Sequence, residues 1–172
     1  MNKDKIINKM KKSCFLIGIL CILAAAFQAF MAFMYLVSKY LYIGRDSNGT
    51  VYAYQSKAME LSAKNAFLRN GFSFLLATII MILAAIMFFY ISKTGIPFAK
   101  RTMTMVRLIG VFTILESFLP GLIAFCITKF HADGILFAMI SPVSLIEGLL
   151  IFSIAYIIKY GTILQQESDE TL

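Results

Sequence analysis

Charged side chains are scarce in this 172-residue chain, at 15% of the sequence, whereas hydrophobic residues make up 60%. A soluble domain carries about 25% charged and about 45–50% apolar residues. So much apolar surface does not fit inside one small core, which excludes a water-soluble globular enzyme and a disordered chain. The composition therefore predicts an integral membrane protein.

Cysteine and histidine are also too few for the chemistry that depends on them. Of the three cysteines (Cys14, Cys21 and Cys126), no two form a C-x-x-C pair, so a disulfide-stapled secreted module is excluded and a thiol enzyme is not supported. The single histidine, His131, has no partner ligands for a metal. No Ser-His-Asp set or glycine-rich phosphate loop is present. We therefore expect no enzyme activity, no catalytic residue, no cofactor and no metal site.

Four long stretches without Lys or Arg are the main positive feature of the chain. Each exceeds the roughly 20 residues that a helix needs to cross about 30 Å of hydrocarbon. Helices are required because lipid offers the backbone no hydrogen-bond partner. We therefore predict an all-α fold, an integral membrane four-helix bundle that forms a single domain over residues 1–172. The predicted spans cover residues 13–38, 70–92, 106–128 and 135–160.

The positions of the cations predict the orientation of the bundle. Ten of the sixteen Lys and Arg residues fall on the side that holds the N-terminus, and positively charged loops and ends are retained in the cytosol. We expect cytosolic N- and C-termini, an outside loop at residues 39–69, a cytosolic elbow at residues 93–105 and a cytosolic tail at residues 161–172. The net charge of +7 then reflects topology and attraction to the lipid bilayer, and we expect no direct nucleic-acid binding.

Three polar side chains within the predicted spans are candidates for an intramembrane site: Gln28, Glu116 and Glu147. A charged side chain in hydrocarbon costs at least ~2.5 kcal/mol, so these residues are expected to face the interior of the bundle. Both glutamates fall near the middle of their spans, where we expect them to meet each other or Gln28. Three interpretations stay open: a shared proton, a cation site, or neutral hydrogen bonding between helices.

Two prolines bear on this glutamate pair. Pro120 lacks an N–H, so it is expected to free the carbonyl of Glu116 and to bend the third helix. Pro142 either kinks the fourth helix or begins it, with Ser141 as the N-cap. In the second case Glu147 lies nearer the outer surface and its pairing with Glu116 weakens.

The elbow and the tail carry turn and charge signals. Gly95 is expected to close the second helix in a left-handed cap, and Pro97 prevents its continuation. The basic residues that follow are expected to reach lipid phosphates. Gly161 is expected to end the fourth helix ahead of an amphipathic acidic stub. The residues expected to contact a cytosolic partner are Gly95, Pro97, Phe98, Lys100, Arg101, Leu164, Gln165, Glu167 and Asp169.

Small residues at helical spacing predict where the helices touch. Helices in lipid associate by close approach at such residues, because apolar burial gives no net drive there. The sixteen phenylalanines and ten methionines are expected to face lipid. The predicted contact residues are Ala25 with Ala29, Ala77 with Ala84, and Gly148 with Ser153 and Ala155.

Two short segments carry a family resemblance. Residues 94–98 read Thr-Gly-Ile-Pro-Phe, and residues 161–172 read GTILQQESDETL. The pair resembles an uncharacterised bacterial family of four-span integral membrane proteins, a domain of unknown function with a G-x-P-F cytosolic loop and a G-x-x-L-Q-x-E-x-D-x-T-L tail. The resemblance implies a multi-pass protein of the bacterial cytoplasmic (inner) membrane. It also implies a small helix-turn-helix regulator as partner, since members are often encoded beside one, and it supplies no catalytic residues.

Three functions follow as hypotheses. The first is a non-enzymatic sensor or anchor that engages a cytosolic regulatory partner through the elbow and the tail. The second is a small transporter or channel subunit that uses the glutamate pair for protons or cations, which requires a homo-oligomer because four spans are few. The third is an immunity protein against a membrane-active peptide.

Overall fold

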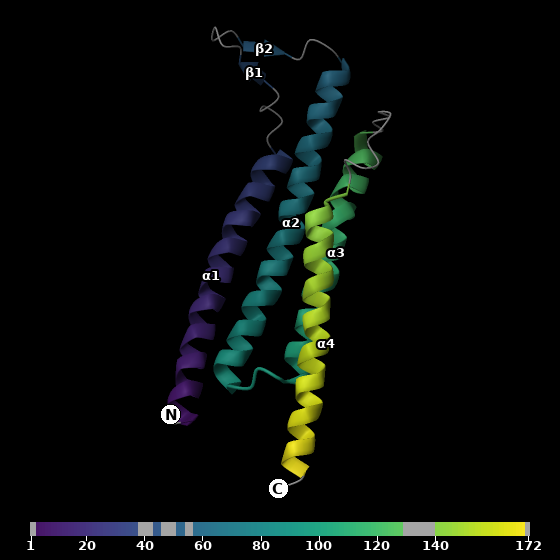
Figure 1. The fold of residues 1–172 in the computed structure, drawn as a ribbon. Helices are drawn as coiled ribbons and strands as arrows, with labels where there is room; N and C mark the ends of the chain where they lie inside the picture. The colour runs from purple at the N-terminus through teal and green to yellow at the C-terminus, as the bar shows by residue number, and fades with distance from the viewer. Residues whose placement is uncertain (1–2, 38–42, 46–50, 54–56, 129–139, 171–172) are drawn as a thin grey trace.

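The chain folds into four long helices and one small strand pair, shown in Figure 1. This computed structural model describes residues 3–37, 43–45, 51–53, 57–128 and 140–170. All four helices are long and apolar enough to cross a membrane, which confirms the predicted all-α, multi-pass architecture. The elements are α1 (Lys3–Val37), β1 (Ile43–Arg45), β2 (Val51–Ala53), α2 (Lys57–Thr94), α3 (Lys100–Thr128) and α4 (Pro142–Glu170).

The helices are longer than the bilayer requires. At about 1.5 Å per residue, the 35 and 38 residues of α1 and α2 extend about 52 Å and 57 Å, and the 29 residues of α3 and of α4 each extend about 43 Å. Every helix therefore has turns to spare outside about 30 Å of hydrocarbon. The ends of α1 and α4 that carry the two termini lie at the same end of the molecule (Figure 1), hereafter the termini end.

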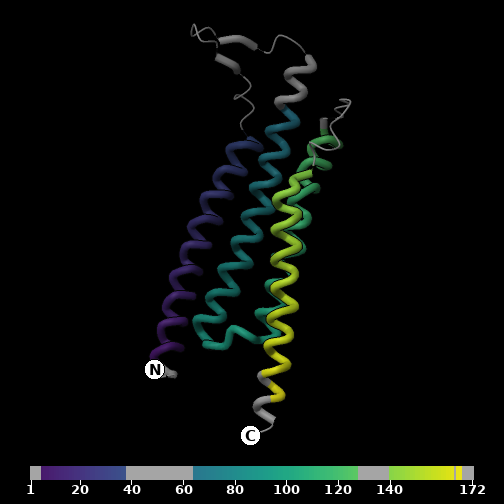
Figure 2. Tube along the Cα trace, viewed as in Figure 1, coloured from purple at the N-terminus to yellow at the C-terminus, as the bar shows by residue number. Residues whose placement is uncertain are grey.

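The four helices form an open row in chain order. Helix α1 packs on α2, α2 on α3, and α3 on α4, and no other helix pair is in contact among the described residues. In Figure 2, α1 lies at one side of the molecule and α4 overlaps α3 at the other. Each outer helix therefore presents most of its circumference to the surroundings.

Small residues make the contact between α1 and α2. Gly18, Ala25 and Ala32 repeat every seven residues on α1 and are buried, which confirms Ala25 as a contact residue, whereas Ala29 is exposed. A Cβ atom on Gly18 would lie 2.9 Å from the ring of Phe89, so the missing side chain is what admits that ring. This is the close approach by which helices associate in lipid.

The outer faces of the row are covered by large apolar side chains. Phe27 of α1 is 64% exposed and Ile157 of α4 is 67% exposed. The buried hydrophobic positions are instead mostly alanine, valine and isoleucine. Such an inverted distribution suits hydrocarbon rather than water as the surrounding medium.

The connection between α1 and α2 contains an antiparallel strand pair. Ile43 pairs with Ala53 and Arg45 with Val51. Both strands belong to the predicted outside loop, and α2 begins within that loop at Lys57.

Candidate functional site

A small polar cavity lies within the apolar helices, in the half of the row away from the termini end. It has a volume of about 130 Å³, which leaves room for a few water molecules or a small polar ligand. Helices α2, α3 and α4 all contribute to it. We call it the serine cavity, and its lining consists of Arg69, Asn70, Ser73, Glu116, Ser117, Pro120, Gly121, Ser141 and Ser144.

Glu116 is the acidic group of the serine cavity. Its carboxylate is half-buried and accepts a hydrogen bond of 2.9 Å from the Ser73 hydroxyl of α2. An ionised carboxylate offers about four acceptor positions, and the described residues fill one of them. The remaining acceptor capacity is available to water, a proton or a small cation. Ser73 was not among the predicted site residues, because a lone serine in an apolar span carries no pattern.

The start of α4 forms one wall of the serine cavity. The backbone N–H of Ser144 donates to the Ser141 hydroxyl (3.4 Å), and that of Leu145 donates to the Ser141 carbonyl (3.1 Å). Ser141 is thus the N-cap and Pro142 the first helical residue, which settles the alternative that the sequence left open. The fourth span therefore begins at Pro142 rather than at residue 135: Ile140 and Ser141 are not helical, and residues 135–139 lie outside the described residues.

The non-helical backbone before α4 is tied to α3. The N–H of Ser141 donates to the carbonyl of Ser117 across the interface (2.8 Å), and the Ser141 and Ser144 hydroxyls lie 3.0 Å apart. Irregular backbone at membrane depth is stable only where protein or a polar cavity satisfies it. The serine cavity and this cross-helix bond meet that requirement.

The second glutamate does not line the cavity. Glu147 precedes Gly148, whose nearest neighbours across the interface are Gly110 and Ile114, whereas Glu116 shares the cavity with Ser144. Glu147 therefore lies nearer the termini end than the cavity, and its side chain is exposed. The side-chain hydrogen bond that Glu116 accepts among the described residues comes from Ser73 and not from Glu147. Among the described residues, the cavity thus has one carboxylate rather than a pair.

Gln28 lies apart from both glutamates. It belongs to α1, which contacts α2 and neither α3 nor α4 among the described residues. Its side-chain oxygen is buried without a hydrogen-bond partner in the described part of the chain. The expected meeting of Gln28 with the glutamates is therefore not present within this row of helices.

The elbow between α2 and α3 confirms the predicted cap. Gly95 has φ of +74°, the left-handed conformation that favours glycine, and its N–H donates to the Ile91 carbonyl (2.7 Å). The N–H of Ile96 donates to the Thr94 hydroxyl (3.3 Å). Pro97 follows, and α3 begins at Lys100.

The end of α4 packs against this elbow. The Thr162 hydroxyl donates to the Phe98 carbonyl (3.2 Å) and to the Ile158 carbonyl of its own helix (2.9 Å). A Cβ atom on Gly161 would lie 3.5 Å from the Phe98 ring. The prediction that Gly161 ends α4 is wrong, because the helix continues to Glu170. Its lack of a side chain serves the contact with Phe98 instead of a helix end.

Two arginines expected to reach lipid phosphates lie over aromatic rings. The guanidinium of Arg101 is 5.1 Å from the centre of the Tyr90 ring, and that of Arg107 is 5.6 Å from the centre of the Tyr156 ring. Both distances suit a cation–π interaction. The Nε atom of Arg107 is also buried without a hydrogen-bond partner among the described residues. Arg107 therefore joins α3 to α4.

Those of the predicted partner-contact residues that the structure describes all lie at the termini end. Phe98 and Leu164 are 44% and 46% exposed, and Lys100, Arg101 and Glu167 are exposed as well. The side chains of Gln165 and Asp169 lie outside the described residues, as does His131. Within the described part of the chain, no group of three acidic, cysteine or histidine side chains is arranged to hold a metal ion.

Comparison with protein-family models, with curated proteins and with solved structures gives no match to this chain.

Proposed function

We propose that this chain is a non-enzymatic protein of the bacterial inner membrane with cytosolic termini. In this proposal it acts as a sensor or an anchor, and it engages a cytosolic regulatory protein. The observation that carries the proposal is the length of α4. The helix meets the elbow at Thr162 and continues to Glu170, about 12 Å further. In Figure 1 this end of α4 extends past the rest of the bundle, where a soluble protein can reach it.

The chemistry of this projection indicates the kind of partner. The sequence from residue 163 to 172 contains three acids, Glu167, Asp169 and Glu170, and no base. Ile163 and Leu164 are 41% and 46% exposed. A helix end with apolar anchors and acidic flanks fits a groove with a basic rim. A small DNA-binding regulator of the helix-turn-helix type, the partner implied by the family resemblance, would offer such basic surface.

A two-hybrid assay against a library of helix-turn-helix regulators from the same cell, backed by recovery from solubilised membranes, tests this proposal. The full chain is compared with a chain that ends at Leu164, which keeps the contact between Thr162 and Phe98. We expect the regulator to bind only the full chain and to bind Glu167→Lys less. The matched control is Glu147→Lys, the same charge change elsewhere on α4. Equal binding by the truncated chain, or no binding by the full chain, overturns the proposal.

The serine cavity supports a second candidate, a small transporter or channel subunit for protons or cations. Among the described residues it has one carboxylate, which accepts one protein hydrogen bond and shares the cavity with serine hydroxyls, Asn70 and Arg69. In reconstituted vesicles we expect Glu116→Gln to abolish a proton or cation flux and Glu147→Gln to leave it, since Glu147 does not line the cavity. No flux from the unaltered chain, or equal loss in both variants, rejects this candidate.

A further inference from the structure

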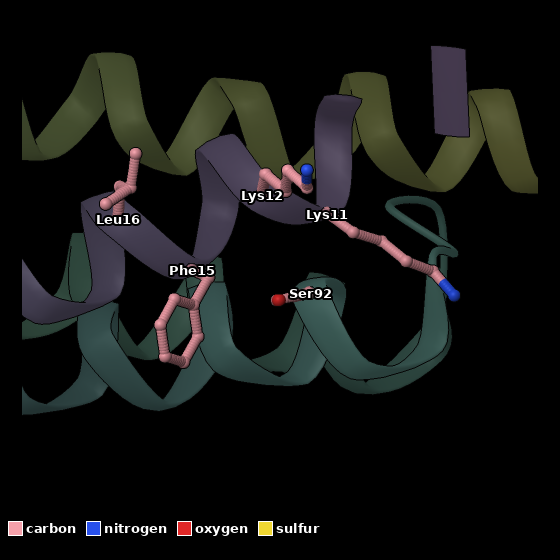
Figure 3. A pocket seen from close by; sticks show the side chains of 5 residues that line it. All are labelled: Lys11, Lys12, Phe15, Leu16 and Ser92. Carbon is pink, nitrogen blue, oxygen red and sulfur yellow. The ribbon is translucent and has the colours of Figure 1, made fainter. Parts of the chain in front are cut away.

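A groove between α1 and α2 opens at the termini end. It has a volume of about 370 Å³ and lies between the early turns of α1 and the last turns of α2 (Figure 3). We call it the lysine groove, and its lining consists of Lys11, Lys12, Phe15, Leu16 and Ser92. It is separate from the serine cavity and from the end of α4, and neither proposed function uses it.

The lining combines two kinds of chemistry. Lys11 and Lys12 line the groove mainly through their apolar stems and carry their ammonium groups at its margin, and the Ser92 hydroxyl points into the space between the helices in Figure 3. The rest of the surface is apolar: Phe15 and Leu16 are 50% and 61% exposed. The groove is therefore an apolar surface with two ammonium groups at one end, and none of the described residues that line it is acidic.

The position of Lys11 is fixed by the cap of α2. A Cβ atom on Gly95 would lie 2.7 Å from Cε of Lys11 and 3.5 Å from its Nζ, so the lysine stem rests on the bare backbone of the cap. Figure 3 shows this side chain extending along the end of α2. The glycine thus admits one ammonium group beside the groove. Lys12 is exposed on a flexible stem that can turn toward the same anion.

The groove lies where charge gives way to hydrocarbon. Lys12 is the last charged residue of α1, and residues 13–37 of that helix carry no charge. On α2 the equivalent change comes at Lys93, next to Ser92. The ammonium groups thus lie at headgroup depth, and Phe15 begins the apolar run. Charged and apolar groups therefore come in the same order as the phosphate and the acyl chain of a phospholipid.

We propose that the lysine groove is a binding site for one anionic phospholipid. The lipid phosphate would lie between the Lys11 and Lys12 ammonium groups with the Ser92 hydroxyl as a further donor, and an acyl chain would cover Phe15 and Leu16. A free phosphate uses only the cationic end and leaves the apolar wall unexplained, so the wall favours the lipid.

The test uses the full chain in nanodiscs of phosphatidylcholine with graded amounts of phosphatidylglycerol, and native mass spectrometry counts the lipids retained. The variant is Lys11→Gln with Lys12→Gln. The control is Lys5→Gln with Lys9→Gln, the same charge change earlier on α1 and outside the groove. We expect phosphatidylglycerol binding to weaken roughly thirty-fold in the variant, about 1 kcal/mol for each ammonium group at the lipid phosphate, and several-fold less in the control, whose lysines lie further from the hydrocarbon.

A second variant separates the lipid from a free anion. Leu16→Gln keeps every charge and makes part of the apolar wall polar. It should therefore weaken phosphatidylglycerol binding, without changing the effect that added inorganic phosphate has on that binding. Circular dichroism and gel filtration confirm that each variant is folded. Equal loss in the lysine variant and its control means general attraction to the headgroups and overturns the proposal. Unchanged binding in either groove variant, or full displacement of phosphatidylglycerol by inorganic phosphate, also overturns it.

Discussion

Gly110 of α3 and Gly148 of α4 face each other so closely that neither position has room for a side chain. A Cβ atom on Gly148 would lie 2.9 Å from the backbone nitrogen of Ile114, and one on Gly110 would lie 3.1 Å from that of Phe152. The Ile114 Cγ1 atom lies closer still to the Gly148 position, at 2.7 Å, but because backbone atoms also obstruct both positions, a rotamer change alone does not make room. Gly148 was predicted as a contact residue from its spacing with Ser153 and Ala155; Gly110 was not.

Gly148→Leu should therefore separate α3 from α4. We expect a loss of about 1–3 kcal/mol in the free energy of unfolding, the usual cost of an overpacked contact. Thermal unfolding in mild detergent, followed by circular dichroism, measures the change. Ser153→Leu is the control, since Ser153 is exposed on the same helix, and an equal loss there would contradict the interpretation.

Ser73→Ala should remove the hydrogen bond that α2 gives to Glu116. Such bonds between membrane helices contribute about 0.6 kcal/mol on average, so we expect a small loss of stability in a denaturation titration. Ser153→Ala, whose hydroxyl bonds only to the Leu149 carbonyl of its own helix, should cost less. A double variant with Glu116→Leu, which removes the acceptor, tests the pairing: the two effects should not add, and full additivity would argue against the bond.

Gly95→Ala should strain the cap of α2. An alanine at φ of +74° costs roughly 1 kcal/mol or more in the left-handed conformation, and its Cβ would also displace the Lys11 stem. Gly161→Ala is the matched control, because Gly161 is helical and a Cβ there meets the Phe98 ring at an ordinary 3.5 Å. We expect thermal melts to show Gly95→Ala destabilised and Gly161→Ala unchanged or stabilised. The reverse order would exclude the left-handed cap.

Ser141→Ala should remove the N-cap of α4, at a cost of about 1 kcal/mol. The effect should be local, so hydrogen exchange of the amides at the start of α4 is the sharpest measurement. We expect faster exchange at Ser144 and Leu145, whose N–H groups bond to Ser141, and no change near Ala155. Uniformly faster exchange along α4 would mean that Ser141 stabilises more than the helix start.

The four spans and the Gly95 cap could be predicted from the sequence because each depends on local physics. An uncharged run of membrane length and a Gly-x-Pro turn act within a few residues of themselves. The start of α4 was harder, since the residues before Pro142 are as apolar as those after it. There the choice depends on the Ser141 cap and its bond to Ser117 of another helix.

The composition of the serine cavity depends on how distant segments align, which no local pattern encodes. Glu116 stood out as a charge in an apolar span, but Ser73 reaches it from 43 residues away. Glu147 looked equivalent to Glu116 only while the fourth span was assumed to start at residue 135. Beginning it at Pro142 changes the level at which α4 meets α3. The prediction that Gly161 ends α4 was wrong because the sequence does not distinguish a glycine inside a helix from a glycine at its end.

The open row of helices has a consequence for how the protein is made. Each described helix contacts only its neighbours along the chain, so every interface forms between segments that are synthesised one after the other. A nascent chain can complete the contact of α1 with α2 before α3 is translated, and no later helix has to fit between two earlier ones. Assembly during membrane insertion can therefore follow the order of translation, without waiting for the C-terminus to close the structure.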